Sequence, residues 1–297
     1  MDAQQMSEQI AAGDGFLAAL DQSGGSTPKA LAAYGVDESA WSSDDEMFAL
    51  IHKMRCRVIE APAFSSGKII GTILFEMTMD GQVDGRPVPD VLHEKGVVPF
   101  IKIDKGLLGP ERGVQLMKPM PDLDDLLSRS KQLGMFGTKE RSVIHAANAD
   151  GVKAIVEQQF EVARQVLGHD LVPIIEPEVD ITSSDREACD DLLVNELQQQ
   201  LDRHNGNPVM LKLSLPVKPG HYDSLVAHPK VLKVVALSGG YERTEACEEL
   251  AKNPGVIASF SRALLNDLRA DMTDEEFDAA LAEAVDEIYQ ASTQKTS

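Results

Sequence analysis

The sequence predicts an α/β fold and, within that class, a closed (β/α)8 barrel of the TIM type. Three observations predict it: a length of 297 residues, eight short apolar runs, and longer amphipathic stretches between those runs. Strands that alternate with helices form parallel sheets, and a chain near 300 residues suits one large barrel. We expect one barrel domain over residues 1–297, with its core at about 14–270 and a C-terminal helix at about 273–290.

The expected strands are short, rich in apolar and β-branched residues, and bounded by glycine, proline or polar turns. They lie at 15–20, 69–75, 97–103, 136–144, 171–179, 208–215, 231–238 and 256–264. The alternative is an open, doubly wound sheet. No GxGxxG motif follows any of these strands, which disfavours the dinucleotide-binding form of that sheet.

Three intervening segments place apolar residues at helical spacing. Residues 154–167 and 190–201 each form one apolar face. The last helix begins at Thr273, where threonine followed three residues later by Glu276 forms a capping-box pattern, and it runs to about Tyr289.

The composition excludes several classes of function. Lysine and arginine number 28 and aspartate and glutamate 48, so the formal net charge is −20. Such acidity argues against a nucleic-acid binder and against attachment to anionic membranes. No apolar run is long enough to span a membrane, and the polar, acidic N-terminus lacks a signal-peptide pattern. We expect a soluble cytoplasmic protein with no nucleic-acid or membrane partner. No interface signature predicts its oligomeric state.

Neither the cysteines nor the histidines form a metal-binding motif. The three cysteines are far apart and include no CxxC pair, and no HxH or HxxH set occurs. These residues are Cys56, Cys189 and Cys247, and His52, His93, His145, His169, His204, His221 and His228. We therefore expect no disulfide framework, no metal and no cofactor, with most histidines at the surface.

Charged residues gather at the ends of the expected strands, where barrel enzymes build their sites. Several form pairs two residues apart, so that both side chains of a pair point to the same face. These pairs are Lys102 and Asp104, Lys139 and Arg141, and Glu176 and Glu178. Asp21 closes the first strand. The alternative is a network of ion pairs that only fills the barrel interior.

Lys212 is the most informative single residue, because it lies in the middle of an expected strand. Alternation along 209–215 turns valine and leucine toward the helices and places Met210, Lys212 and Ser214 in the barrel interior. Loss of solvation and a second cation such as Lys139 favour the neutral amine, which is the nucleophile of imine formation. An ion-paired lysine without chemistry is the alternative.

The remaining polar groups suit imine chemistry on a phosphorylated substrate. Glu176 and Glu178 can move protons, and Asp21 can take one from a hydroxyl. Two glycine-rich turns, at 21–26 and 238–240, offer hydroxyls and backbone N–H groups to anions. With Lys29, Lys102 and Arg262 available, these turns predict a substrate with a phosphate at each end.

Eight blocks in order resemble the class I fructose-1,6-bisphosphate aldolases, most closely the shorter bacterial members. The blocks are LDQSGGS, GTILFE, VVPFIKIDKG, FGTKERSVI, LVPIIEPEVDI, VMLKLSLP, VALSGG and ASFSRAL, which span nearly the whole chain. The resemblance implies reversible cleavage of fructose 1,6-bisphosphate to dihydroxyacetone phosphate and glyceraldehyde 3-phosphate, in glycolysis or gluconeogenesis, without a metal.

The resemblance also implies a role for each matched residue. Lys212 is then the Schiff-base lysine, Glu176 the proton carrier of imine formation, and Asp21 the base for the C4 hydroxyl. Lys139 is the second catalytic lysine, with Arg141 and Glu178 as its neighbours. The site of the C6 phosphate comprises Ser23, Ser26 and Lys102, and that of the C1 phosphate comprises Ser238, Gly239 and Arg262.

Several positions depart from the animal pattern. Gln22 replaces an acidic residue on what reads as an exposed turn. Glu140 replaces a tryptophan, and alternation points it outward. Ser261 replaces a glycine whose N–H contacts phosphate. Tyr289, on a helix surface, is a poor substitute for the C-terminal tyrosine of the animal tail.

Other readings compete with this one. They are a Schiff-base aldolase that prefers another ketose phosphate, a metal-dependent aldolase, and a barrel that binds sugar phosphates without catalysis. For a fructose-1,6-bisphosphate aldolase, the predicted site residues, with Lys29, carry six positive and three negative charges, so we expect a mouth with a formal excess of three positive charges inside an acidic shell.

Overall fold

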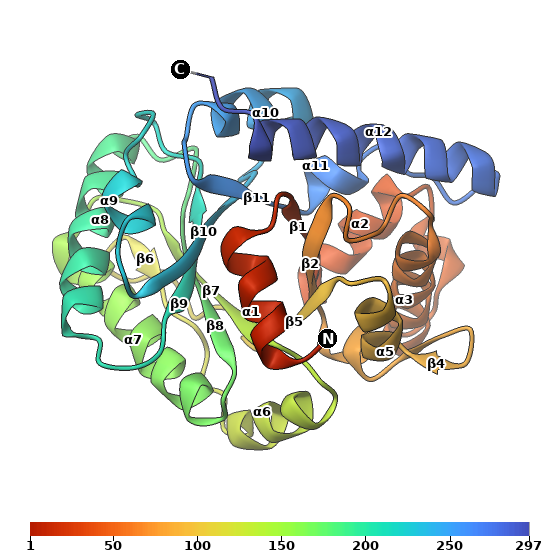
Figure 1. Ribbon diagram of the computed structural model, residues 1–297, viewed down its shortest axis with the longest axis horizontal. Helices are drawn as coiled ribbons and strands as arrows, with labels where there is room; N and C mark the ends of the chain where they lie inside the picture. The colour runs from red at the N-terminus through yellow and green to blue at the C-terminus, as the bar shows by residue number, and fades with distance from the viewer. Residues whose placement is uncertain (297) are drawn as a thin grey trace.

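The computed structural model describes residues 1–296 and, at Gly24, the backbone alone; it contains a barrel of eight parallel strands (Figure 1). The barrel strands are β1 (Phe16–Leu20), β2 (Ile69–Leu74), β5 (Val98–Lys102), β7 (Gly137–Ile144), β8 (Val172–Val179), β9 (Val209–Ser214), β10 (Val231–Leu237) and β11 (Val256–Phe260). Three two-residue strands lie outside the barrel wall: β3 (Gln82–Val83), β4 (Arg86–Pro87) and β6 (Val114–Gln115).

The barrel is closed, which confirms the predicted fold and rules out the open sheet. The first and last strands pair in parallel, with Leu17 opposite Ser259. On the other side β5 pairs with β7, with Phe100 opposite Gly137. Closure leaves no exposed barrel edge and brings the carboxyl ends of all eight strands to one rim.

Seven of the expected strands are confirmed with ends that differ by at most one residue. The eighth prediction, 256–264, is wrong at its end, because the strand stops at Phe260. Ser261 has φ −109° and ψ −76°, and the next four residues form the short helix α11 (Arg262–Leu265). The apolar run Ala263–Leu265 is buried, and a short buried apolar run fits a strand or a helix, so hydrophobicity alone could not distinguish them.

Helices cover the outside of the barrel. The long ones are α1 (Ala3–Ala12), α3 (Asp44–Glu60), α6 (Leu123–Gln132), α7 (Ala149–Gly168), α8 (Arg186–Arg203), α10 (Arg243–Ala251) and α12 (Asp274–Thr293). The short ones are α2 (Thr27–Ala33), α4 (Glu76–Met79), α5 (Val88–Glu94) and α9 (Asp223–Val226), with single 3-10 turns at Gly24–Ser26 and Glu38–Ala40. The three predicted helices are confirmed as α7, α8 and α12, and the capping box of Thr273 and Glu276 is formed.

The first helix, α1, covers the N-terminal end of the barrel (Figure 1). Met6 and Ile10 are buried in one cluster with interior residues such as Phe100 and Met210. The side chain of Gln9 donates to the carbonyl oxygens of Ile70 and Gly96, each at 2.7 Å. This end is therefore filled with apolar side chains, and the opposite end is left for polar groups.

The last described residues are anchored at the same N-terminal end. Lys295 Nζ donates to the carbonyl oxygens of Leu250, Val256 and Ala291 at 3.2, 2.6 and 2.8 Å, and burial lowers its pKa to about 8. The ring of Tyr289 lies 5.9 Å from the ammonium group of Lys68, just before β2. Tyr289 is thus remote from the carboxyl ends of the strands, which agrees with its rejection as a tail tyrosine.

Within residues 1–296, no helix combines the length and apolar character that crossing a membrane requires.

A tight backbone contact at the start of β7 gives a test of the barrel. An added Cβ at Gly137 would lie 2.0 Å from the carbonyl oxygen of Val172 and 2.9 Å from the Phe100 ring. We expect Gly137→Ala to lower the free energy of unfolding by about 3 kcal/mol, because neither β8 nor the packed ring can move away. Urea unfolding measures it.

The matched control is Gly168→Ala at the end of α7, where an added Cβ meets nothing within 4 Å. There we expect a gain of about 0.5 kcal/mol from helix propensity. Equal stabilities of the two variants would contradict the close approach of β7 and β8.

Candidate functional site

A cavity of about 710 Å³ opens at the carboxyl ends of the barrel strands. Its lining contains every residue that the sequence predicted for the site. These are Asp21, Ser23, Ser26, Lys29, Lys102, Lys139, Arg141, Glu176, Glu178, Lys212, Ser238, Gly239 and Arg262. Strand ends and the two glycine-rich turns therefore indicated which side chains share the cavity.

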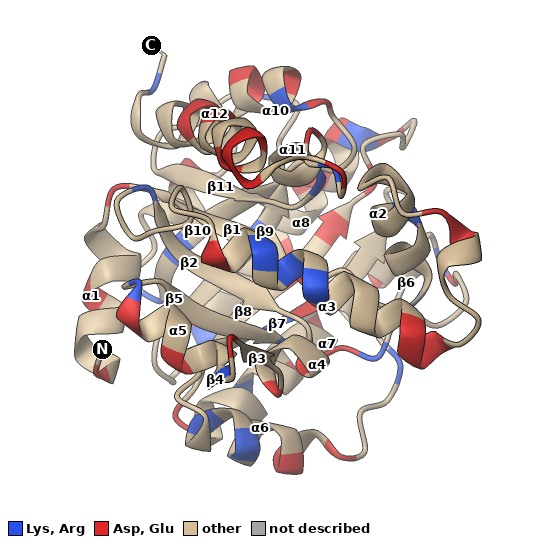
Figure 2. Ribbon diagram, turned by 90° about the vertical axis from the view of Figure 1, so that its right-hand side faces the viewer, with Lys and Arg blue, Asp and Glu red and all other residues tan. Residues whose placement is uncertain are grey.

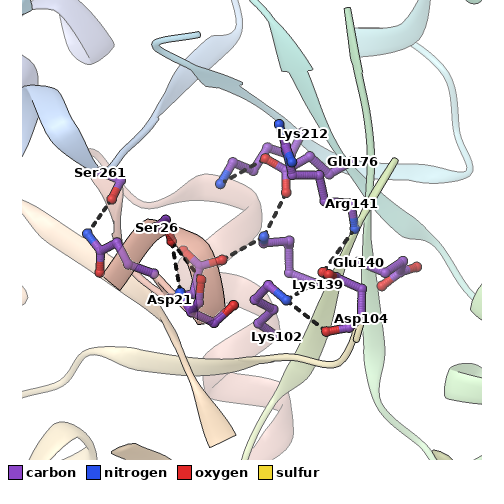
Figure 3. Close-up of polar contacts among 12 residues, drawn as sticks. Asp21, Ser26, Lys102, Asp104, Lys139, Glu140, Arg141, Glu176, Lys212 and Ser261 are labelled. Carbon is purple, nitrogen blue, oxygen red and sulfur yellow. Dashed lines mark hydrogen bonds and ion pairs between the residues drawn. The ribbon is translucent and has the colours of Figure 1, made fainter. Parts of the chain in front are cut away.

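Four charged side chains form a continuous chain of ion pairs across the floor of the cavity (Figure 3). Lys139 Nζ lies 2.6 Å from Asp21 Oδ2 and 2.8 Å from Glu176 Oε2. Lys212 Nζ lies 3.2 Å from the other oxygen of Glu176. All four side chains are buried, which is tolerable only because each charge has an opposite charge beside it.

The ion pairs keep Asp21 and Lys139 charged despite their burial. Burial alone would raise the pKa of Asp21, but the ammonium groups of Lys139 and Lys212 outweigh it and lower that pKa. Burial would likewise lower the pKa of Lys139, but Asp21 and Glu176 raise it above its ordinary value. At neutral pH Asp21 is therefore a carboxylate that can accept a proton, and Lys139 is a fixed cation.

The backbone of β8 and β9 explains how Glu176 and Lys212 come to face each other. The ladder between these strands runs through Ile174–Met210 and Ile175–Leu211. The pairing is not continued beyond Ile175, which fits Pro177, a residue with no N–H to donate. Further along, the Ser214 hydroxyl accepts from Val179 N at 3.0 Å and donates to Val179 O at 2.7 Å. Glu176 and Lys212 thus lie across the interrupted stretch.

A second group of charges lies beside the chain of four. Lys102 Nζ is 2.7 Å from Asp104 Oδ1, and Asp104 Oδ2 accepts from the backbone N–H of Arg141 at 3.2 Å. Arg141 Nε in turn donates to Glu178. Burial lowers the pKa of Lys102, although Asp104 opposes that change. The i,i+2 pairs predicted from sequence do point into the cavity together.

The two glycine-rich turns lie at the rim. The hydroxyl of Ser26 accepts from Ser23 N at 3.0 Å and donates to Ser23 O at 2.9 Å, which closes the first turn. In the second turn Gly239 and Gly240 have φ of +63° and +126°, which disfavour side chains. A Cβ at Gly240 would lie 3.5 Å from the guanidinium group of Arg262, so the second turn and Arg262 are neighbours.

The charge balance of the cavity differs slightly from the expectation. Six basic and four acidic side chains line it, leaving a formal excess of two positive charges rather than three. The difference is Asp104, a strand-end residue that also lines the cavity. The acidic excess lies on outer helices such as α12 (Figure 2), where Asp274, Glu275 and Glu283 are exposed.

Sequence reasoning was wrong about Gln22 and missed Arg55. Gln22 is half-buried and not on an exposed turn, since its Nε2 donates to Ser261 Oγ at 2.6 Å. Arg55, on α3, is fully buried and donates to the carbonyl oxygen of Gln22. Gln22 and Ser261 are 239 positions apart, and no local pattern signals such a contact.

Glu140 points away from the cavity, as alternation predicted, but it is buried (Figure 3). It lies on the outer face of β7 against α7, where Gln159 Nε2 is 3.4 Å from its carbonyl oxygen. Its Oε1 has no hydrogen-bond partner among the described residues. Burial, with a smaller contribution from Asp104, raises the pKa of Glu140 well above its ordinary value.

Within residues 1–296, no three side chains of His, Cys, Asp or Glu are arranged as a set of metal ligands. The expectation of mostly surface histidines was incomplete, because His204 is buried and the other six are half-buried. The three cysteines are unpaired, and burial raises the pKa of Cys247 to about 12.

A closed (β/α)8 barrel with a buried lysine and carboxylate at its mouth is the arrangement of a class I aldolase, a lyase. The comparison with family models agrees: residues 2–215 match the family described as fructose-bisphosphate aldolase class-I, and the chain belongs to that family. The matched range contains the four ion-paired residues and ends before Ser238, Gly239 and Arg262.

A solved structure is similar over the whole barrel. It is a fructose-bisphosphate aldolase from Plasmodium falciparum, in a ternary complex with TRAP and a small-molecule inhibitor. The TM-score is 0.77 at 18% identity, and the alignment covers 99% of this chain and 96% of that chain. At this identity the likeness establishes the fold.

The buried carboxyl of Glu140 gives a prediction on stability and pH. Because its folded pKa is raised, the folded state holds its proton above pH 4.5 and the unfolded state does not. Its contribution is therefore complete below about pH 4.5 and is lost as the pH rises toward the folded pKa. We expect Glu140→Gln to raise the free energy of unfolding at pH 8 by about 1–2 kcal/mol, and by less at pH 5.

Thermal unfolding of wild type and variant at both pH values measures the difference. The control is Glu283→Gln on the exposed face of α12, which should change little at either pH. An equal effect of Glu140→Gln at pH 5 and pH 8 would count against a raised pKa.

Proposed function

We propose that the chain is a fructose-1,6-bisphosphate aldolase that cleaves its substrate reversibly through an imine on Lys212. It would work in glycolysis or gluconeogenesis in the cytoplasm. The observation that carries the proposal is the buried amine of Lys212, 3.2 Å from Glu176 and part of one ion-pair chain with Lys139 and Asp21. Membership of the class I family supports it.

In this proposal the two turns bind the two phosphates. The C1 phosphate binds to Ser238, Gly239 and Arg262, which are neighbours at the ends of β10 and β11. The C6 phosphate binds near Ser23, Ser26 and Lys102. The cation excess of the cavity and the open backbone of Gly239 and Gly240 support anion binding at these places.

Lys212 first passes a proton to Glu176, which is in contact with it, and the free amine then attacks the C2 ketone. The carbinolamine loses water after Glu176 returns the proton to its hydroxyl. The oxygen nearest Lys212 is Glu176 Oε1, at 3.2 Å, so the proton passes over a short distance. Lys139 stays charged and stabilises whichever carboxylate is ionised.

Carbon–carbon cleavage uses Asp21. The carboxylate takes the proton of the C4 hydroxyl, the C3–C4 bond breaks, and its electron pair moves into the protonated imine to give an enamine. Glyceraldehyde 3-phosphate leaves, C3 is reprotonated, and hydrolysis frees dihydroxyacetone phosphate. Tyr289 lies at the other end of the barrel, beside Lys68, so it takes no part in the reprotonation of C3 in this proposal.

Reductive trapping tests the nucleophile. With dihydroxyacetone phosphate and borohydride, we expect a stable adduct on the peptide that contains Lys212 and loss of activity in proportion, read by mass spectrometry and a cleavage assay. Lys212→Arg should give no adduct, and the exposed Lys153→Arg should label like wild type. An adduct elsewhere, or none, would overturn the mechanism, and ligand binding without turnover would favour the non-catalytic barrel.

Replacing Asp21 separates cleavage from imine formation. We expect Asp21→Asn to lower kcat for fructose 1,6-bisphosphate by about 10²–10⁴, because the base for the C4 hydroxyl is lost. Trapping of dihydroxyacetone phosphate on Lys212 should persist, since that step needs no C4 proton. Asp125→Asn on α6, an exposed aspartate outside the cavity lining, serves as a control of similar chemistry. Parallel loss of trapping and turnover would contradict this assignment.

A further inference from the structure

Arg55 is a buried arginine whose observed hydrogen-bond partners are all neutral. One of its nitrogens, Nη1, donates to the Thr78 hydroxyl at 2.9 Å. The other, Nη2, donates to the carbonyl oxygen of Gln22 and lies 3.4 Å from Gln22 Oε1. The guanidinium group also lies over the Phe75 ring, 5.9 Å from its centre. A buried cation with only neutral hydrogen-bond partners is costly, and the charge of the Asp21 carboxylate opposes part of that cost.

Gln22 connects Arg55 to Ser261 across the mouth of the barrel. Its carboxamide oxygen accepts from Arg55 Nη2 at 3.4 Å, and its Nε2 donates to Ser261 Oγ at 2.6 Å. Gln22 directly follows Asp21 and directly precedes Ser23. Ser261 directly precedes Arg262. The contact therefore joins the turn after β1 to the segment after β11.

We propose that Arg55, Gln22 and Ser261 form a bracket that fixes the separation of the two phosphate-binding ends and so selects substrates with two phosphates over those with one. The inference rests on the proposed function, because the phosphate positions come from it. Gln22 and Ser261 act here as partners through their hydrogen bond.

The physical argument concerns simultaneous binding. A ligand with one phosphate can settle at either end without regard to the other. A bisphosphate of fixed length gains affinity from the second phosphate site only if the two sites are already separated by the distance between its phosphates. Loss of the Gln22–Ser261 contact would let the turn after β1 move relative to Arg262. The affinity would then fall most for a ligand that binds both phosphate sites at once.

The bracket can be tested with ligands that do not react. A hexitol 1,6-bisphosphate and a hexitol 1-phosphate lack the carbonyl, so calorimetric affinities are independent of catalysis. We expect Ser261→Ala and Gln22→Ala each to weaken the bisphosphate about tenfold and the monophosphate less than twofold. Ser261→Thr keeps the hydroxyl and should restore the affinity. The double variant should be no weaker than either single variant, because both remove one contact.

Kinetics give a second measurement. For fructose 1,6-bisphosphate, KM should rise about tenfold in Ser261→Ala and Gln22→Ala while kcat changes less than twofold, because the ion-pair chain is untouched. Arg55 is kept, since its removal would strand buried polar groups and test folding.

The outcomes are distinct. Equal weakening of both ligands, no weakening, additive losses in the double variant, or failure of Ser261→Thr to rescue would each overturn the bracket. Absence of turnover with the binding pattern intact would overturn only the proposed function. Absence of any binding to wild type would overturn both.

Discussion

The buried ammonium group of Lys139 is the interaction on which the site depends. It neutralises Asp21 on one side and Glu176 on the other, and Glu176 in turn contacts Lys212. None of these charges could stay buried alone, so each side chain needs its oppositely charged neighbours, which lie on other strands. The requirement reaches into the backbone: β1, β7, β8 and β9 must hold a register that brings the four side chains together. Barrel closure is the condition that meets it.

Much of the fold and of the site could be predicted from the sequence, because they follow from the two-residue alternation of strands and from which residues end each strand. Strand alternation predicted that Lys102 and Asp104, or Glu176 and Glu178, share a face, and strand ends predicted the cavity lining. What could not be read depends on contacts between distant segments. Arg55 reaches the site from a helix, and Gln22 meets Ser261 from the other end of the chain. Glu140 alternates as expected, but only tertiary packing decides that α7 covers it. The helix at Arg262–Leu265 was missed because its buried apolar residues fit a strand equally well.

Negative charge predominates at the surface of the molecule, and positive charge predominates in the cavity. The net charge of −20 is carried largely on outer helices, whereas the cavity holds a small cationic excess. Within the cavity the cations differ in freedom: Lys139 and Arg141 are committed to carboxylates, Lys102 is held by Asp104, and Arg262 lies beside an open glycine turn. The cations proposed for chemistry, Lys139 and Lys212, both contact Glu176, whereas Lys102, proposed for phosphate binding, is paired with Asp104. Fixed placement of acid and base groups suits proton transfer.

The anchoring of Lys295 at the amino ends of the strands has a practical consequence. The ammonium group is tied to α10, β11 and α12 at once, so a polypeptide attached after this segment would begin on the face opposite the cavity. A fusion partner, a purification tag or a linker to a solid support placed there would leave the mouth open to substrate. The same attachment at the rim loops would obstruct it. The barrel is thus oriented for immobilisation from one end and use from the other.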